Sequence, residues 1–196
     1  MFKDESGLRV VGILGVYDVT DPDNIVEMVK KNAVHEGNIV YNIAKAFVGG
    51  DDCKSSIGWL GFGDGGSEIA NTGRITYRPT NTSRSRNELA DLYNRTYQKK
   101  VDDEGFKMSI SPVVHSRPIA DINIDVMLYM GEPSGQLPMD NTVEFGDNFV
   151  FDEIGLFTNE DDPNDAMMLT HVIFHPIQKS LNRTLQIKYT LRFEIV

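Results

Sequence analysis

Residues 184 to 195 alternate between polar and apolar side chains without a break. The apolar positions are Leu185, Ile187, Tyr189, Leu191, Phe193 and Ile195. A repeat of two residues is typical of a β-strand, in which successive side chains point to opposite faces of the sheet. A register slip of one residue would turn the whole apolar set toward water, so the register of this strand is strongly specified. The chain is therefore expected to fold around a sheet with a buried face.

Residues 166 to 175 form another strand pattern, in which apolar side chains occupy both alternating sets. This composition is typical of a strand that is covered on both faces. We expect it to be a central strand of an antiparallel sheet, with the strand at 185 to 195 paired beside it through a turn region at 176 to 183. Further strands are expected at 56 to 62 and 119 to 130.

Residues 102 to 105, Asp-Asp-Glu-Gly, are typical of a hairpin turn. They predict that strands at 97 to 101 and 106 to 111 pair with each other. Residues 131 to 148 are rich in Gly, Pro, Asp and Asn and predict a long loop. A loop of that length in a compact domain is usually functional or a contact arm.

Two helices are predicted near the N-terminus. Thr20 or Asp21 followed by Pro22 suits the cap and first position of a short helix, whose apolar residues lie between 25 and 29. A second pattern follows Gly37, with apolar residues at helical spacing from 39 to 47 and two glycines as its stop. We expect this pair of helices to cover one face of the sheet.

These elements define the expected fold class. It is α+β and mainly β, an antiparallel β-sandwich-like sheet with two N-terminal helices packed on it and long loops. Residues 1 to 20 are expected to be an N-terminal arm or strand, which could pair with a neighbouring subunit. Residues 21 to 196 then form a single β-rich domain that is long enough to bury a core.

Composition excludes several classes of partner. The formal net charge is −10 and the isoelectric point is near 4.8, so a nucleic-acid-binding surface is not expected. No apolar run approaches the roughly 20 residues of a membrane span, and no secretory signal is expected at the N-terminus. The single cysteine, Cys53, excludes an intrachain disulfide and fits a reducing compartment of synthesis.

A glycine-rich turn follows the strand expected at 56 to 62. Its residues are Gly63, Asp64, Gly65 and Gly66. Backbone N–H groups in such turns can bind phosphate. However, the Lys-Ser/Thr of a phosphate loop is missing, and Asp64 would repel an anion. We expect a tight structural turn that needs positive φ angles.

Four arginines lie close together in the sequence of an otherwise acidic chain. They are Arg74, Arg78, Arg84 and Arg86. This local basic patch could contact an acidic neighbour in an assembly, or it could be a solvated loop. Both interpretations stay open at this point.

The sequence shows no convergent set of catalytic groups. His171 and His175 lie roughly 13 Å apart along a strand, which is too far for both to bind one metal ion. We expect them to be polar residues at a sheet rim or a subunit contact. Alternation would place Asp152 and Glu153 on opposite faces, so they would not act together as acid and base. We predict no catalysis, no cofactor and no metal.

Several motifs carry a resemblance to a known family. In order, they are Ile-Ala-Lys-Ala-Phe at 43 to 47, Gly-Phe-Gly-Asp-Gly-Gly at 61 to 66, Leu-Tyr-Asn-Arg at 92 to 95 and Phe-Asp-Glu-Ile-Gly-Leu-Phe at 151 to 157. The chain resembles the tail-collar fibre proteins of tailed bacteriophages over most of residues 36 to 160. The candidate contact residues of the last motif are Glu153, Ile154, Gly155, Leu156 and Phe157.

The resemblance implies a virion-attachment domain in a short, adaptor-like member of the family. Such a protein is an oligomeric, non-catalytic structural adaptor of the neck, collar, tail or baseplate that anchors fibres or neighbouring tail components. The implied partners are other copies of the chain in a ring or trimer and other phage tail, neck or fibre proteins. The protein would be made and assembled in the host cytoplasm and located in the virion.

Two other functions are compatible with the same pattern. One is a capsid decoration protein that stabilises the head. The other is a carbohydrate-binding or hydrolysing β-sandwich module, because sandwich scaffolds host many functions. The last alternative requires an aromatic groove, and Trp59 is the only tryptophan available for it.

Overall fold

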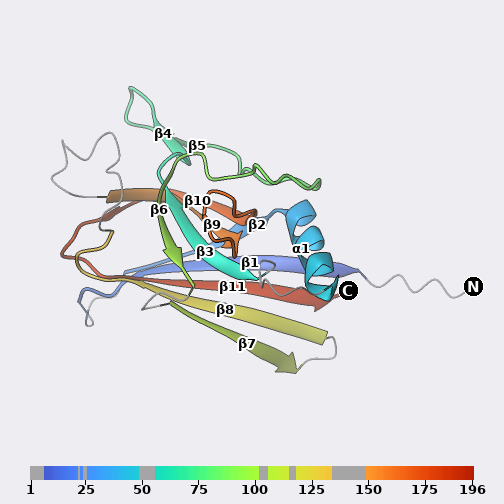
Figure 1. Cartoon of the computed structure of the whole chain (residues 1–196). Coiled ribbons are helices and arrows are strands. Elements are labelled where there is room, and N and C mark those ends of the chain that lie inside the picture. The colour runs from blue at the N-terminus through green and yellow to red at the C-terminus, as the bar shows by residue number, and fades with distance from the viewer. Residues whose placement is uncertain are drawn as a thin grey trace, which may run out of the picture.

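A computed structural model describes residues 7 to 21, 23, 26 to 48, 56 to 101, 106 to 114, 118 to 133 and 149 to 196. Within these ranges the chain is mainly β (Figure 1). The strands are β1 (Leu8–Asp18), β2 (Val26–Val34), β3 (Ile57–Gly63), β4 (Ser67–Ile69), β5 (Ile75–Tyr77), β6 (Arg95–Lys100), β7 (Phe106–Val114), β8 (Pro118–Leu128), β9 (Phe149–Thr158), β10 (Met168–Lys179) and β11 (Leu185–Ile195), and the helix is α1 (Glu36–Val48).

The described strands form one large antiparallel sheet and a small hairpin. The strand order is β6-β3-β9-β10-β2-β1-β11-β8-β7, and β4 pairs only with β5. Between β10 and β2 only two residue pairs are in register, Thr170 with Val34 and His171 with Ala33. At this junction the sheet divides into two layers, which Figure 1 shows with β3, β6, β9 and β10 above β1, β11, β8 and β7.

The main core lies between these two layers. One cluster of buried side chains combines Leu14 and Tyr189 from the lower layer with Phe62 and Phe174 from the upper layer. Tyr189 also donates its hydroxyl proton to Thr170 Oγ1 of β10 at 2.5 Å, which links the layers directly. Full burial of an apolar side chain contributes about 1.5 to 3 kcal/mol, so this cluster is the main source of stability. The β-sandwich-like arrangement is therefore confirmed.

The strands β9 and β10 are buried on both faces. A second cluster, which includes Leu92, Phe157 and Met168, lies on the face opposite the main core. Helix α1 is fastened nearby, because Asn38 Nδ2 donates to the carbonyl of Met168 at 2.7 Å. This double cover confirms that the apolar pattern at 166 to 175 belongs to a central strand.

The prediction of two N-terminal helices is wrong. The second helix exists as α1, but residues 26 to 34 form β2, which pairs with β1 in register, Val16 opposite Met28. The local sequence contains Ile25, Val26 and Val29, and β-branched residues favour strands. A short apolar run fits both the helical repeat of 3.6 residues and the strand repeat of two residues. Here the pairing with β1 selects the strand.

Two predicted pairings are also wrong. Strand β11 pairs with β1 and β8, whereas β10 pairs with β9 and β2, so β10 and β11 meet across the core instead of lying side by side. Strands β6 and β7 lie at the two ends of the strand order and do not form a hairpin. The turn predicted between them, residues 102 to 105, lies outside the described residues.

The strand expected at the N-terminus is β1. It pairs with β11 along its whole length, from Leu8 opposite Ile195 to Asp18 opposite Leu185. From Gly12 onward it also pairs with β2. The described part of the segment expected as an arm is therefore an interior strand of the sheet.

The bond between the layers gives a test of this packing. Replacement of Tyr189 by Phe keeps the ring in the core and removes the hydroxyl that bonds to Thr170. We expect the free energy of unfolding to fall by about 1 to 2 kcal/mol, measured by urea denaturation. The control is Tyr129→Phe at a partly exposed position, which should change stability by less than about 0.5 kcal/mol. Equal effects at both positions would contradict the proposed link.

Candidate functional site

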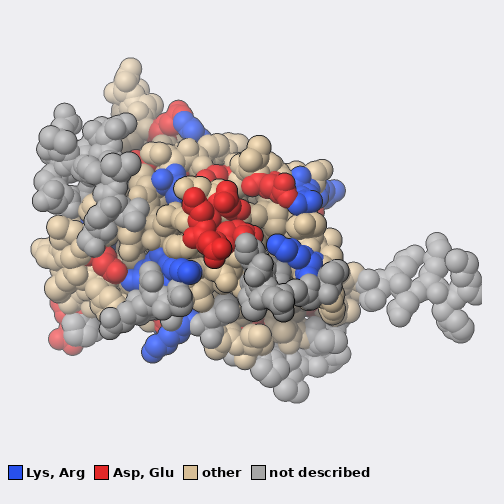
Figure 2. All heavy atoms as spheres, in the orientation of Figure 1, with Lys and Arg blue, Asp and Glu red and all other residues tan. Residues whose placement is uncertain are grey.

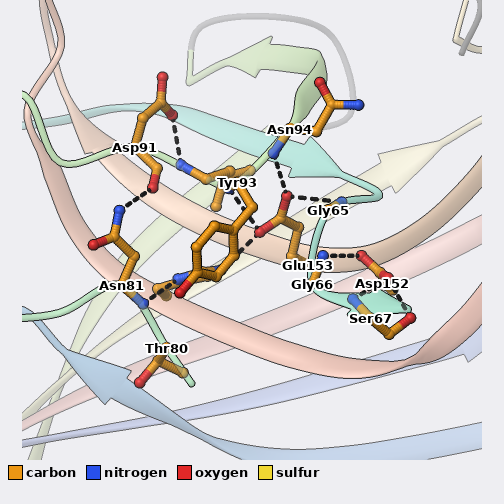
Figure 3. A network of polar contacts seen from close by, with 12 residues as sticks. Gly65, Gly66, Ser67, Thr80, Asn81, Asp91, Tyr93, Asn94, Asp152 and Glu153 are labelled. Atoms are coloured by element: carbon orange, nitrogen blue, oxygen red, sulfur yellow. Dashed lines mark hydrogen bonds and ion pairs between the residues drawn. The ribbon is translucent and has the colours of Figure 1, made fainter. Parts of the chain in front are cut away.

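Three of the motifs that carry the family resemblance meet in space. In the pairing of β3 with β9, Gly61 lies opposite Gly155 and Gly63 lies opposite Glu153. From β9, Glu153 reaches the backbone of Gly65 and of Asn94 (Figure 3). The segments 61 to 66, 92 to 95 and 151 to 157 therefore form one structural unit.

The Glu153 carboxylate is the centre of this unit. It is fully buried and accepts four hydrogen bonds. Oε1 accepts from the backbone N–H groups of Asn94 at 2.8 Å and Gly65 at 3.1 Å. Oε2 accepts from the backbone N–H of Tyr93 at 3.0 Å and from His171 Nε2 at 2.9 Å. One side chain thus joins a turn, a loop and two neighbouring strands.

His171 continues the network on its other side. Its Nδ1 accepts the backbone N–H of Asn81 at 2.8 Å, so the proton lies on Nε2 and points at Glu153. Asn81 in turn donates from Nδ2 to the carbonyl of Asp91 at 2.9 Å. The histidine ring therefore joins the backbone at Asn81 to Glu153 of β9.

Asp152 holds the other end of the glycine turn. Its Oδ1 accepts the backbone N–H of Gly66 at 2.8 Å, and its Oδ2 accepts the N–H and hydroxyl of Ser67 at 2.7 and 2.5 Å. The expectation that Asp152 and Glu153 lie on opposite faces is wrong. Phe151 and Ile154 both belong to the main core, so alternation breaks between them, and the register with β10 shifts at the same place.

The glycines of the turn are required for close approach, not for positive φ. A Cβ at Gly65 would lie 2.7 Å from the backbone nitrogen of Asn94, and one at Gly63 would meet the carbonyl oxygen of the same residue. Among the described glycines, positive φ angles occur at Gly73 and Gly131. The prediction of a positive-φ turn is therefore wrong, and the absent side chains instead make room for the 93 to 94 backbone.

The remaining candidates of the last motif are packing residues. Ile154 and Leu156 lie in the main core, and Phe157 lies in the second cluster. A Cβ at Gly155 would lie 3.0 Å from a ring carbon of Phe157 and from the Thr170 carbonyl. These side chains hold the sheet and its cover together.

The arginines of the predicted basic patch are mostly paired within the chain. Arg78 bonds to Glu68 at 2.6 Å, and Arg84 lies 3.5 Å from Glu36. Arg86 pairs with Glu88 and stacks over the ring of Tyr41. Arg74 is exposed and makes no ion pair with any described residue. These carboxylates neutralise most of the patch.

The two histidines have different surroundings. His171 is fully buried, so its expected place at a sheet rim is wrong. His175 is exposed and lies 3.2 Å from the Tyr77 hydroxyl. Across the described ranges, no group of three or more His, Cys, Asp or Glu side chains could hold a metal ion.

The pKa values reflect the network. Burial alone would raise the pKa of Glu153, but the hydrogen bonds from His171, Asn94 and Tyr93 outweigh it and the pKa is lowered. Burial raises the pKa of Asp152, against the bonds from Ser67 and Gly66. Burial also raises the pKa of Asp64 to about 6; the bond from Asn94 opposes this, and the nearby carboxylates add to it.

Sequence reasoning did not connect the polar residues that complete the network. Asn81, Asn94 and His171 lie in different segments, and no fixed spacing relates them. One signal in the sequence could have indicated the network. It is the combination of the Gly-rich turn at 63 to 66 with the carboxylate pair Asp152 and Glu153, which is flanked by apolar residues. Because every acceptor of Glu153 and His171 already has a donor from this chain, the network acts as a structural clamp.

No family model, curated protein or solved structure that was compared with this chain matches it. In the part of the chain that the structure describes, no helix has the length and apolar character needed to cross a membrane.

The clamp predicts a large effect for a nearly isosteric change. In Glu153→Gln, the amide NH₂ would face either the Gly65 and Asn94 donors or the Tyr93 and His171 donors. We expect a loss of about 3 kcal/mol or more in the free energy of unfolding. In the control Glu68→Gln, only an exposed ion pair is lost, and the cost should stay below about 1 kcal/mol. A similar cost for both variants would argue against the clamp.

Removal of the charge of Asp64 should increase stability in a pH-dependent way. Because its pKa is raised in the folded protein, ionisation disfavours the folded state as the pH rises from about 4 to about 6. Asp64→Asn keeps the acceptor for Asn94 and removes the charge. The full pKa shift of Asp64 would correspond to about 3 kcal/mol in the free energy of unfolding. Because the side chain is only half buried, solvent screens the charge, and we expect the variant to gain about 1 kcal/mol.

The measurement is urea denaturation of both proteins between pH 4 and pH 7.5. The gain in the variant should be close to zero at the acid end and should reach its full value above about pH 6. A difference between the two proteins that does not change with pH would contradict the assignment.

Proposed function

We propose that this chain is a structural protein of a tailed-bacteriophage virion. In this proposal it is an oligomeric adaptor of the neck, collar, tail or baseplate that anchors fibres or neighbouring tail components. Its partners are other copies of itself and other tail, neck or fibre proteins.

The observation that carries the proposal is the convergence of the motifs on Glu153. The resemblance to the tail-collar fibre family rests on short segments, each of which is weak alone. In the fold, the segments 61 to 66, 92 to 95 and 151 to 157 are joined by the bonds of one carboxylate. Residues that are far apart in sequence and meet in one clamp are a stronger basis for a shared domain than separate matches.

The surface of the fold supports an assembly role. The β4–β5 hairpin projects from the sheet (Figure 1), and its Ile69 side chain is 72% exposed. Strands β6 and β7 end the strand order of the described sheet, so each has one edge that pairs with no other described strand. Edges of this kind can be covered by neighbouring copies in a symmetric oligomer.

The direct test is to locate the chain in purified particles of the phage whose genome encodes it. We expect mass spectrometry to detect the chain in the particles and gold labelling of a tagged C-terminus to mark the neck, tail or baseplate. Particles that lack the chain should have tails without attached fibres or collar. Labelling of the head would instead indicate a decoration protein.

A second experiment uses a tagged protein whose β4–β5 hairpin is altered by Ile69→Asp. This change is on the surface and should leave folding intact while incorporation into particles falls. Fully decorated tails in particles that lack the chain would contradict the proposal.

A further inference from the structure

Helix α1 carries its apolar residues on two different sides. Ile39 is buried and Ile43 packs against the main core, so these two residues face the sheet. Val40 and Phe47 are 62% and 87% exposed, and Ala44 is exposed as well. The apolar positions between 39 and 47 therefore cover more of the helix circumference than the sheet buries.

The three exposed residues form an outer stripe along α1, which consists of Val40, Ala44 and Phe47. They are separated by four and three positions, so their side chains lie one above another on the same face. The exposed face of a surface helix is normally polar. In α1 the pattern is reversed, because the buried side carries Asn38 and Asn42 while the outer stripe has no charged or hydrogen-bonding side chain.

The buried asparagine Asn38 fixes this orientation of the helix. Its Nδ2 donates to the carbonyls of Met168 and Asn87 at 2.7 and 2.9 Å, and its Oδ1 accepts the backbone N–H of Asn87 at 2.8 Å. A rotation of α1 that turned the outer stripe inward would break all three bonds. The outer stripe is therefore a fixed part of the surface.

The surface beside the first turn of α1 is balanced in charge. Arg84 lies 3.5 Å from Glu36, and Arg86 pairs with Glu88. Arg86 also stacks over the ring of Tyr41 in the second turn. Each of the two cations at this end thus has a carboxylate beside it.

The surface beside the last turn of α1 is acidic. Lys45 of this turn lines a groove together with Asp165 of the connection between β9 and β10. Asp161 and Asp162 of the same connection are exposed, as Asp165 is. Figure 2 shows acidic side chains gathered over this connection. One ammonium group does not balance these carboxylates, so this end keeps a net negative charge.

We infer that α1 packs against α1 of a second copy of this chain, antiparallel and about a two-fold axis. The outer stripe suits such a contact because it has a large side chain at each end and a small one near its centre. Val40 of one copy then meets Phe47 of the other, and Ala44 lets the two helices approach closely. No charged group of the outer stripe loses its water.

Charge favours both the second copy and the antiparallel direction. Two chains with a formal net charge of −10 repel each other, so they associate best through a surface without carboxylates, such as the outer stripe. A basic partner would gain most at the acidic β9–β10 connection instead. Antiparallel packing places the acidic end of one helix beside the balanced end of the other and so avoids contact between like charges.

The inference rests on the proposed function only for the expectation that copies associate, and it adds the surface and the symmetry of the contact. The dimer is measured on the isolated chain, whereas the virion assignment is tested by locating the chain in particles. Failure of one is therefore distinguishable from failure of the other.

The oligomeric state of the whole chain tests the contact. Sedimentation equilibrium should show a dimer with a dissociation constant that is roughly micromolar. Phe47→Asp puts a carboxylate into the contact once from each copy, so the dissociation constant should rise at least about hundredfold. Ile69→Asp, at another exposed position, is the matched control and should dimerise as the unaltered chain does. Val40→Asp repeats the test if Phe47→Asp lowers the midpoint of thermal unfolding.

Two results would overturn the contact. One is a chain that stays monomeric at about 100 μM. The other is a dimer that neither Phe47→Asp nor Val40→Asp weakens, because its interface would then lie elsewhere.

Disulfide formation tests the direction of the helices. With Cys53 replaced by Ser, Ala44→Cys places the two new thiols next to the two-fold axis, so oxidation should link two copies. In Val40→Cys the two thiols lie about 10 Å apart along antiparallel helices, and no link should form. Efficient linking through Val40→Cys would indicate parallel helices and would contradict the inference.

Discussion

The cover of the upper layer depends on one buried carboxylate. Glu153 has no contact with water, and an ionised group in that position is tolerated only if its oxygens are fully hydrogen-bonded. Four N–H donors from three segments meet this requirement. The fold thereby gains a fixed geometry for the turn at 64 to 66 and for the loop at 93 to 94. Neither segment has a strand ladder of its own at these residues.

The clamp also explains why the upper layer differs from the lower one. In the lower layer, β8 and β11 bury one face and leave alternate residues at the surface, as the sequence of β11 shows. In the upper layer, β9 and β10 are covered twice, by the main core and by the 78 to 94 segment with α1. The second cover is mostly loop, so it needs side-chain bonds to the sheet, and Glu153, His171 and Asn38 provide them.

Periodicity predicted most strands of this fold but not their neighbours. The alternation at 185 to 195 and the double cover of 166 to 175 follow directly from residue types, and both were predicted. The pairing of these strands was not predicted. The apolar side chains of β10 and β11 would be buried equally well if the strands lay side by side or faced each other across a core. The shared side of Asp152 and Glu153 depends on a shift in register that alternation cannot show. The hydrogen bonds that Glu153 accepts come mostly from backbone N–H groups. Such bonds require no particular residue type or spacing in the donor segment, so the sequence carries no pattern for them.

The most direct measurement of the clamp is native-state hydrogen exchange of individual backbone amides. If Glu153 holds its three segments as one unit, the amides of Gly65, Tyr93 and Asn94 should open with the same free energy as the paired amides of β9, although they lie in loops. If these amides exchange as fast as those of exposed loops while β9 stays protected, Glu153 does not hold the segments together.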